Sequence, residues 1–173
     1  MRAFTPIHSA AIAGFACLML FIPSPTFAQT KQEAWVRALA SDVDDYEDWN
    51  LRQDNKDLYL RAFGDFDGDG RQDEAYLAKN VAAGQYGVFV KLRKADAPIE
   101  LDWGELKSLP RVGLYELKPG KYSDFCARMR NRPADCVPHV SIPNEAFAVV
   151  YFEASSLTHY FKYGKWETVW TSD

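Results

Sequence analysis

Residues 58–77 read Leu-Tyr-Leu-Arg-Ala-Phe-Gly-Asp-Phe-Asp-Gly-Asp-Gly-Arg-Gln-Asp-Glu-Ala-Tyr-Leu, an aspartate-rich run between two stretches in which apolar residues alternate. Leu60 and Ala62 belong to the alternation before the run, and Ala75 and Leu77 to the alternation after it. A period of two is typical of β-strands that bury one face. The stretch therefore predicts a strand, a tight loop and a second strand.

The loop between these strands has the composition of a metal site. Its carboxylates occupy alternate positions and then one more, at Asp65, Asp67, Asp69 and Asp73. Two carboxylates about 4 Å apart repel each other by roughly 1 kcal/mol in water, and by about 4 kcal/mol at an effective dielectric near 20. A hard cation with six to eight oxygen ligands removes this repulsion, and Ca²⁺ fits best. Gly70 permits the bend, and the backbone carbonyl of Arg71 is the expected main-chain ligand. The alternative is an acidic surface turn that binds no ion.

The loop resembles two known calcium-binding patterns. An EF-hand needs helices on both sides and a glutamate at its twelfth position, which here is Tyr76. The run Gly64–Gly70, with the apolar strand that follows, resembles instead the loop of FG-GAP and VCBS-type repeats. This resemblance covers roughly residues 62–79. It implies Ca²⁺ bound by the four aspartates and the carbonyl of Arg71. Members of that family usually repeat the unit, and this sequence contains no second copy.

Residues 1–28 have the pattern of an export signal. An apolar run, Ala10–Ile22, follows a single basic residue, and Thr26–Ala28 offers small residues at the positions that a signal peptidase requires. Cleavage before Gln29 and a periplasmic or secreted location are expected. A lipid anchor on Cys17 is the alternative, but the three residues before this cysteine make a poor acylation site.

Residues 29–173 are expected to form a single domain. The chain has 20 basic and 24 acidic residues, and residues 1–28 hold one arginine and no acid, so the expected mature net charge is 19 − 24 = −5. An acidic chain without a basic stripe argues against a nucleic-acid partner. The apolar run Ala10–Ile22 is too short for a transmembrane helix, and no transmembrane segment is expected in residues 29–173. Two cysteines remain, Cys126 and Cys136, and an even count in an exported protein predicts a disulfide.

The patterning predicts an α+β fold that is mostly antiparallel β. Thr30 and Glu33 form a capping box, and the apolar residues that follow recur at helical spacing, so we expect one N-terminal helix, Lys31–Tyr46, packed on a sheet. Beyond Lys56 about nine short strands follow, with hairpins at Asn80–Gly84 and Gly164. The later strands are expected near residues 86–92, 99–103, 112–117, 139–142, 146–153, 157–163 and 165–171. The acidic run over residues 42–48 is a candidate second metal site, although a solvated face is the simpler interpretation.

The sequence contains no recognisable catalytic constellation, and no catalytic residue is predicted. Ser155 and Ser156 lie near His159 but lack a nucleophile elbow, and His159 and His139 are interpreted as ordinary strand residues. Three arginines line the cysteine loop, at Arg128, Arg130 and Arg132. They could dock an acidic protein or an anionic polymer of the cell envelope, and a solvated loop is the alternative.

Residues 29–173 as a whole also resemble small exported bacterial proteins that carry one such aspartate loop and end in an aromatic hairpin, here Tyr160–Asp173. The resemblance implies an exported location and a bound calcium ion, but it implies no enzymatic reaction. We therefore expect an exported calcium-binding protein in which the loop is a structural staple and the domain is a binding or interaction module. The alternative is a hydrolase that acts on cell-envelope material through carboxylates that spacing does not reveal.

Overall fold

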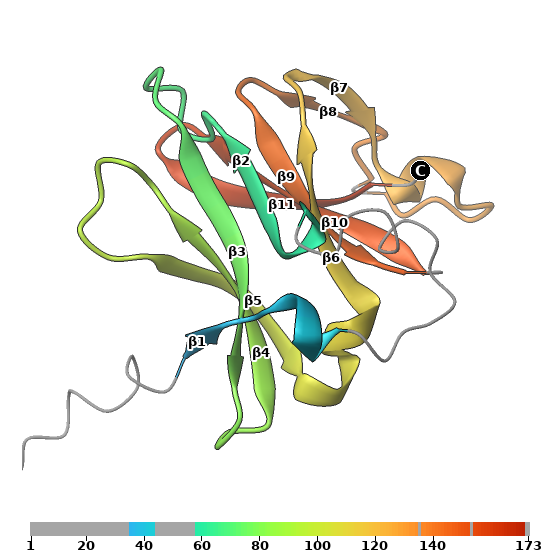
Figure 1. Cartoon of the computed structure of the whole chain (residues 1–173). Coiled ribbons are helices and arrows are strands. Elements are labelled where there is room, and N and C mark those ends of the chain that lie inside the picture. The colour runs from blue at the N-terminus through green and yellow to red at the C-terminus, as the bar shows by residue number, and fades with distance from the viewer. Residues whose placement is uncertain (1–34, 44–57, 135, 153, 172–173) are drawn as a thin grey trace, which may run out of the picture.

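The computed structural model describes residues 35–43, 58–134, 136–152 and 154–171. This part of the chain is built mostly from antiparallel β-sheets, and its helical elements are short 3₁₀ turns (Figure 1). Within it, no helix has the length and apolar character needed to cross a bilayer. The predicted β-rich fold is confirmed.

The first sheet contains the strand–loop–strand unit. Its five strands are β1 (Val36–Arg37), β2 (Arg61–Gly64), β3 (Asp73–Asn80), β4 (Gln85–Lys91) and β5 (Ile99–Glu105). The order is β1-β3-β4-β5, and β2 pairs with the first half of β3 while β1 pairs with its end. The β3–β4 hairpin turns at Asn80–Gly84 as predicted, because the side chain of Asn80 accepts a hydrogen bond from the backbone N–H of Ala83.

The second sheet is made from the C-terminal half of the chain. Its four strands are β6 (Val112–Leu117), β9 (Ala146–Tyr151), β10 (Ser155–Lys162) and β11 (Lys165–Thr171), in the order β11-β10-β9-β6. A separate hairpin pairs β7 (Gly120–Ser123) with β8 (His139–Ile142). The 3₁₀ turns are η1 (Ala40–Asp42), η2 (Leu58–Leu60), η3 (Leu106–Arg111) and η4 (Phe125–Arg128).

The second sheet is the middle layer of the fold. On β9, Phe147 and Val149 pack into a core shared with the first sheet. The alternate residues, Ala146 and Ala148, face a smaller cluster that includes Ile142 of β8. Burial on both faces explains why this strand is a continuous apolar run rather than an alternating one. Figure 1 shows the two sheets on either side of the main core, with β7 and β8 beyond the second sheet.

The predicted N-terminal helix is not confirmed. The part of Lys31–Tyr46 that the structure describes, residues 35–43, forms β1 and η1 instead of an α-helix. Pairing with the edge of β3 explains the difference, because Ala38 N–H donates to the carbonyl of Leu77 over 2.9 Å. The guanidinium of Arg37 also binds the carboxylate of Glu74. The flanking residues of the predicted helix, and most of the acidic run over 42–48, lie outside the described residues.

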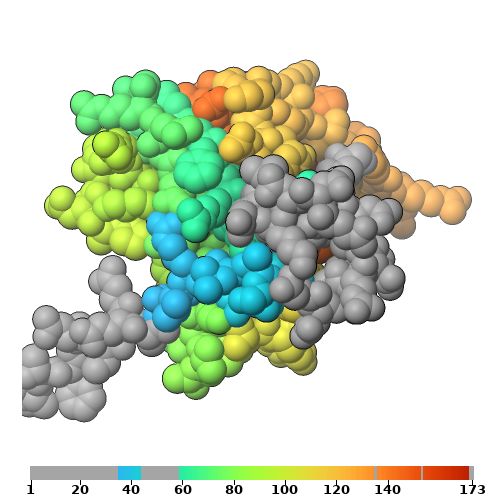
Figure 2. Space-filling view, in the orientation of Figure 1, coloured from blue at the N-terminus to red at the C-terminus, as the bar shows by residue number. Residues whose placement is uncertain are grey.

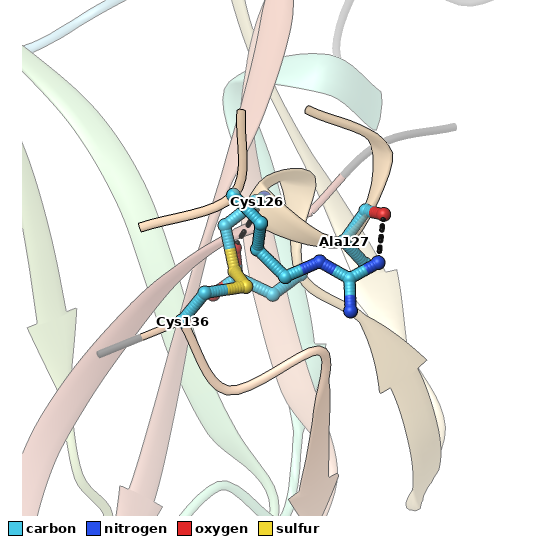
Figure 3. The surroundings of a disulfide bond; sticks show 5 residues. Cys126, Ala127 and Cys136 are labelled. Carbon is cyan, nitrogen blue, oxygen red and sulfur yellow. Dashed lines mark hydrogen bonds between the residues drawn. A yellow bond between two sulfur atoms is a disulfide. The ribbon is translucent and has the colours of Figure 1, made fainter. Parts of the chain in front are cut away.

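The predicted disulfide is present in the loop between β7 and β8. Cys126 and Cys136 are bridged with their Cα atoms 5.9 Å apart. Within the loop, Arg132 Nη2 donates to the carbonyl oxygen of Ala127 over 2.8 Å (Figure 3). The loop projects from the body of the molecule, and is light orange in Figure 2.

Replacing both cysteines, Cys126→Ser with Cys136→Ser, should lower the free energy of unfolding by about 2–3 kcal/mol. The bridge spans 10 residues, and closing a loop of that length reduces the entropy of the unfolded chain by this amount. Urea denaturation of residues 29–173 measures the change as a lower midpoint at an equal or larger slope. An unchanged midpoint would show that the bridge does not constrain the unfolded chain.

Candidate metal centre

Three of the predicted ligands converge in the loop between β2 and β3. Asp65, Asp67 and Asp73 each offer a carboxylate oxygen, and these oxygens lie within 4.8 Å of one another. Among the residues that the structure describes, this is the one group of three or more histidine, cysteine or acidic side chains close enough to hold an ion together.

Backbone N–H groups orient the first two carboxylates. Asp65 Oδ2 accepts a hydrogen bond from Gly70 N–H at 2.9 Å, and Asp67 Oδ1 accepts one from Asp69 N–H at 3.2 Å. The bend that permits this uses Gly70, whose φ of +81° favours glycine. The second oxygen of each carboxylate, Asp65 Oδ1 and Asp67 Oδ2, is buried and accepts no hydrogen bond. The side chain of Asp67 has no exposed surface. Each of these two carboxylates therefore has one oxygen held by a backbone N–H and a second, buried oxygen that accepts no backbone hydrogen bond.

Asp73, the first residue of β3, connects the loop to a remote turn. Its side chain is buried, with Oδ2 accepting from Phe66 N–H at 3.0 Å and Oδ1 from Arg93 N–H at 2.7 Å. Burial raises the pKa of Asp73, and the hydrogen bonds from Arg93 and Phe66 oppose that rise. Each oxygen keeps a second lone pair, so the carboxylate can still bind a cation.

The loop is fastened to both sheets. Phe66 is fully buried in the shared core, with its ring centroid 5.2 Å from that of Phe147 on β9. The segment that leads into β9 also contacts the loop backbone, because Glu145 Oε2 accepts from Asp65 N–H at 2.8 Å. Gly68 allows this segment to approach, since its φ is +76° and a Cβ atom there would lie 2.8 Å from the Asn144 side chain.

The other two predicted ligands lie on the exposed side of the loop. Asp69 Oδ1 accepts from Arg71 N–H at 2.9 Å, and Asp69 is not part of the three-carboxylate cluster. Arg71 is exposed at the end of the same turn. The structure thus brings together Asp65, Asp67 and Asp73, and leaves the roles of Asp69 and the Arg71 carbonyl as predictions.

Comparison of this chain with protein-family models, with curated proteins and with solved structures finds no match. The strand–loop–strand context nevertheless distinguishes the loop from an EF-hand. The position where an EF-hand has its glutamate, Tyr76, lies within β3, and its ring stacks on Phe89 at 5.7 Å between centroids.

Sequence reasoning missed two charged residues beside the loop. Lys94 Nζ lies 2.6 Å from Asp67 Oδ2, in an ion pair. Glu145, which holds the backbone of Asp65, is itself paired with Lys118 at 2.5 Å. Neither residue belongs to the aspartate motif, and only the pairing of distant strands brings them to it.

A second polar cluster lies inside the sandwich. Tyr151 OH donates a hydrogen bond to Asp102 Oδ2 at 3.1 Å. His159 on β10 is 1% exposed, stacks on Phe147, and has no hydrogen-bond partner on either ring nitrogen. Burial lowers the pKa of His159 to about 4, against a smaller opposing effect of Asp102. His159 is therefore a neutral core residue at pH 7, whereas His139 on β8 is exposed.

Proposed function

We propose that this protein is an exported calcium-binding protein whose loop, residues 65–73, is a structural staple. The observation that carries the proposal is that the carboxylates of Asp65, Asp67 and Asp73 converge, while Asp65 Oδ1 is buried without a hydrogen bond and Asp67 Oδ2 is buried beside the ammonium of Lys94. A buried carboxylate oxygen without a partner, such as Asp65 Oδ1, is costly, and a cation that coordinates it removes the cost. Asp69 and the carbonyl of Arg71 would supply further ligands from the exposed side.

The donor set favours Ca²⁺ over other ions. All three converging groups are carboxylates, which are hard oxygen ligands, and the cluster contains no histidine or cysteine that would favour zinc. Ca²⁺ accepts six to eight oxygens in a flexible geometry, whereas Mg²⁺ demands a small octahedron. A loop that supplies alternate aspartates from an extended backbone suits the larger ion.

The staple role follows from the contacts that Asp73 and Asp65 already make with other segments. Asp73 binds the turn at Arg93, and Asp65 is bonded through its N–H to Glu145, which precedes the second sheet. An ion shared by Asp65, Asp67 and Asp73 would lock the β2–β3 loop to both of these segments. Because the unfolded chain cannot hold the ligands together, binding would stabilise the folded state.

Calorimetric titration of residues 29–173 with CaCl₂ tests this function. We expect one Ca²⁺ per chain with a dissociation constant on the order of 10⁻⁴ to 10⁻³ M, as in extracellular calcium modules, and weaker binding of Mg²⁺. Absence of uptake over this concentration range would identify the loop as an acidic turn that binds no ion.

Export is part of the proposal and is supported by the signal-like residues 1–28 and by the disulfide, which is typical of oxidising compartments. Mass spectrometry of the protein recovered from a periplasmic or secreted fraction should find a mature N-terminus at Gln29. An intact Met1 in a cytoplasmic fraction would contradict export.

We place the interaction surface on the disulfide loop. Arg128, Arg130 and Arg132 are exposed there, close in sequence to the exposed side chains of Phe125 and Met129. A basic and apolar loop held by a covalent bridge suits an acidic partner protein or an anionic envelope polymer. Arg130→Glu should weaken retention on an immobilised anionic polysaccharide, and Lys107→Glu, which makes the same charge change on η3, should have less effect. Equal retention of the two variants would contradict this surface.

A further inference from the structure

The metal loop has a positive charge of its own chain beside it. Lys94 Nζ lies 2.6 Å from Asp67 Oδ2, which is one of the two buried oxygens that accept no hydrogen bond. The charges of Asp69 and Asp73 act on the same ammonium group. The Lys94 side chain is 54% exposed while that of Asp67 has no exposed surface, so the ammonium approaches the cluster from the solvent side.

The backbone that carries Lys94 is held in place independently of its side chain. Arg93 N–H donates to Asp73 Oδ1 at 2.7 Å, and Ala95 N–H donates to the carbonyl of Leu92 at 3.1 Å, which closes a turn after β4. Lys91 Nζ binds the carbonyl of Ala95 on the same turn. Lys94 is therefore fixed at its Cα and free to rotate about four side-chain bonds, so its ammonium can leave the loop without moving the turn.

We propose that Lys94 is a tethered cation that neutralises the loop when no ion is bound and competes with the divalent ion for Asp67. An incoming ion needs Asp67 Oδ2 as a ligand, and like charges cannot share this buried oxygen without strong repulsion. The ammonium must then swing into solvent, which its exposed position allows. Lys94 thus sets the calcium affinity of the loop and protects the ion-free fold from repulsion among its aspartates. This inference rests on the proposed calcium site.

Lys94→Met tests the charge alone, because methionine keeps about the length of the apolar stem of lysine and lacks its ammonium. We expect the dissociation constant for Ca²⁺ to fall by about 2- to 5-fold, the range that follows when a modest ion pair is no longer broken on binding. In chelator, the same variant should melt at a lower temperature than wild type, because three carboxylates lose their counter-charge.

Lys107→Met is the matched control. Lys107 on η3 pairs with Glu105 at 2.6 Å and is 81% exposed, so this variant makes the same change in net charge at a residue paired outside the loop. It should leave both the calcium affinity and the melting temperature in chelator near the wild-type values. Calorimetric titration with CaCl₂ and thermal melts in chelator measure both effects on residues 29–173.

The outcomes separate this inference from the function on which it rests. Tighter calcium binding by Lys94→Met alone, with a lower melting temperature in chelator, supports the tethered cation. Equal affinities of Lys94→Met and wild type, or equal tightening in both lysine variants, overturn it and leave the calcium site intact. Failure of all three proteins to take up Ca²⁺ overturns the calcium site itself.

Discussion

Millimolar Ca²⁺ should raise the melting temperature of the wild-type protein and leave that of Asp67→Ala almost unchanged. At a calcium concentration ten times the dissociation constant, mass action stabilises the folded state by about 1.4 kcal/mol. For a chain of this size that corresponds to a rise of roughly 3–6 °C. Asp67→Ala removes Oδ2, the buried oxygen that accepts no hydrogen bond, and so removes a central ligand.

The same variant should cost little in chelator. It loses the hydrogen bond from Asp69 N–H and the ion pair with Lys94, but it also relieves repulsion with Asp65 and Asp73. Asp96→Ala is the matched control, because Asp96 is an exposed acid close to Lys94 in sequence and outside the carboxylate cluster. Thermal melts of the three proteins with millimolar calcium and with chelator decide the matter. Identical melting of wild type in both buffers would refute the stabilising site.

Acidification from pH 7 to pH 4.5 should destabilise wild type by about 2–3 kcal/mol more than His159→Phe. The pKa of His159 is lowered to about 4 in the folded state, whereas an unfolded histidine has a pKa near 6.5. The unfolded state therefore binds a proton as the pH falls below 6.5, and the folded state does not do so until about pH 4. Each pH unit across this window favours unfolding by about 1.4 kcal/mol.

A phenyl ring at residue 159 can keep the stacking on Phe147 while removing both ring nitrogens that lack a hydrogen-bond partner. His139→Gln is the control, since His139 is exposed on β8 and its loss should leave the pH dependence of wild type in place. Urea denaturation at the two pH values gives the free energies. Carboxylates contribute to acid destabilisation in every variant, so the difference between variants isolates His159. Parallel losses in wild type and His159→Phe would show that His159 is not the source.

The strands could be predicted because their periodicity is a local property. The alternation around the aspartate loop, and the turn residues at Asn80–Gly84 and Gly164, agree with the hairpins β2–β3, β3–β4 and β10–β11. The predicted helix is not confirmed for the residues that the structure describes, because their conformation depends on a strand that is distant in the sequence. Val36 and Leu39 have helical spacing, but the unpaired edge of β3 offered hydrogen bonds to Val36 and Arg37 that a helix would have forgone.

The pairing of Cys126 with Cys136 was a matter of counting, because only two cysteines remain after residue 28. The arrangement of the candidate site could not be predicted from the sequence in this way. The acidic spacing and the glycine at residue 70 identify the loop, but nothing in residues 65–73 indicates that Asp73 would bind Arg93 or that Lys94 would face Asp67.

The sequence by itself determined that this chain is rich in antiparallel strands, that four of its aspartates lie in one sharply bent loop, and which cysteines are bridged. These properties depend on neighbours along the chain, whose side-chain periodicity, backbone freedom and number can be read directly. The tertiary structure alone decided which carboxylate oxygens stay buried without a hydrogen bond and which cation lies beside them. Those outcomes depend on Arg93 and Glu145, which lie 20 and 80 residues from their partners Asp73 and Asp65 and meet them only when the sheets pack.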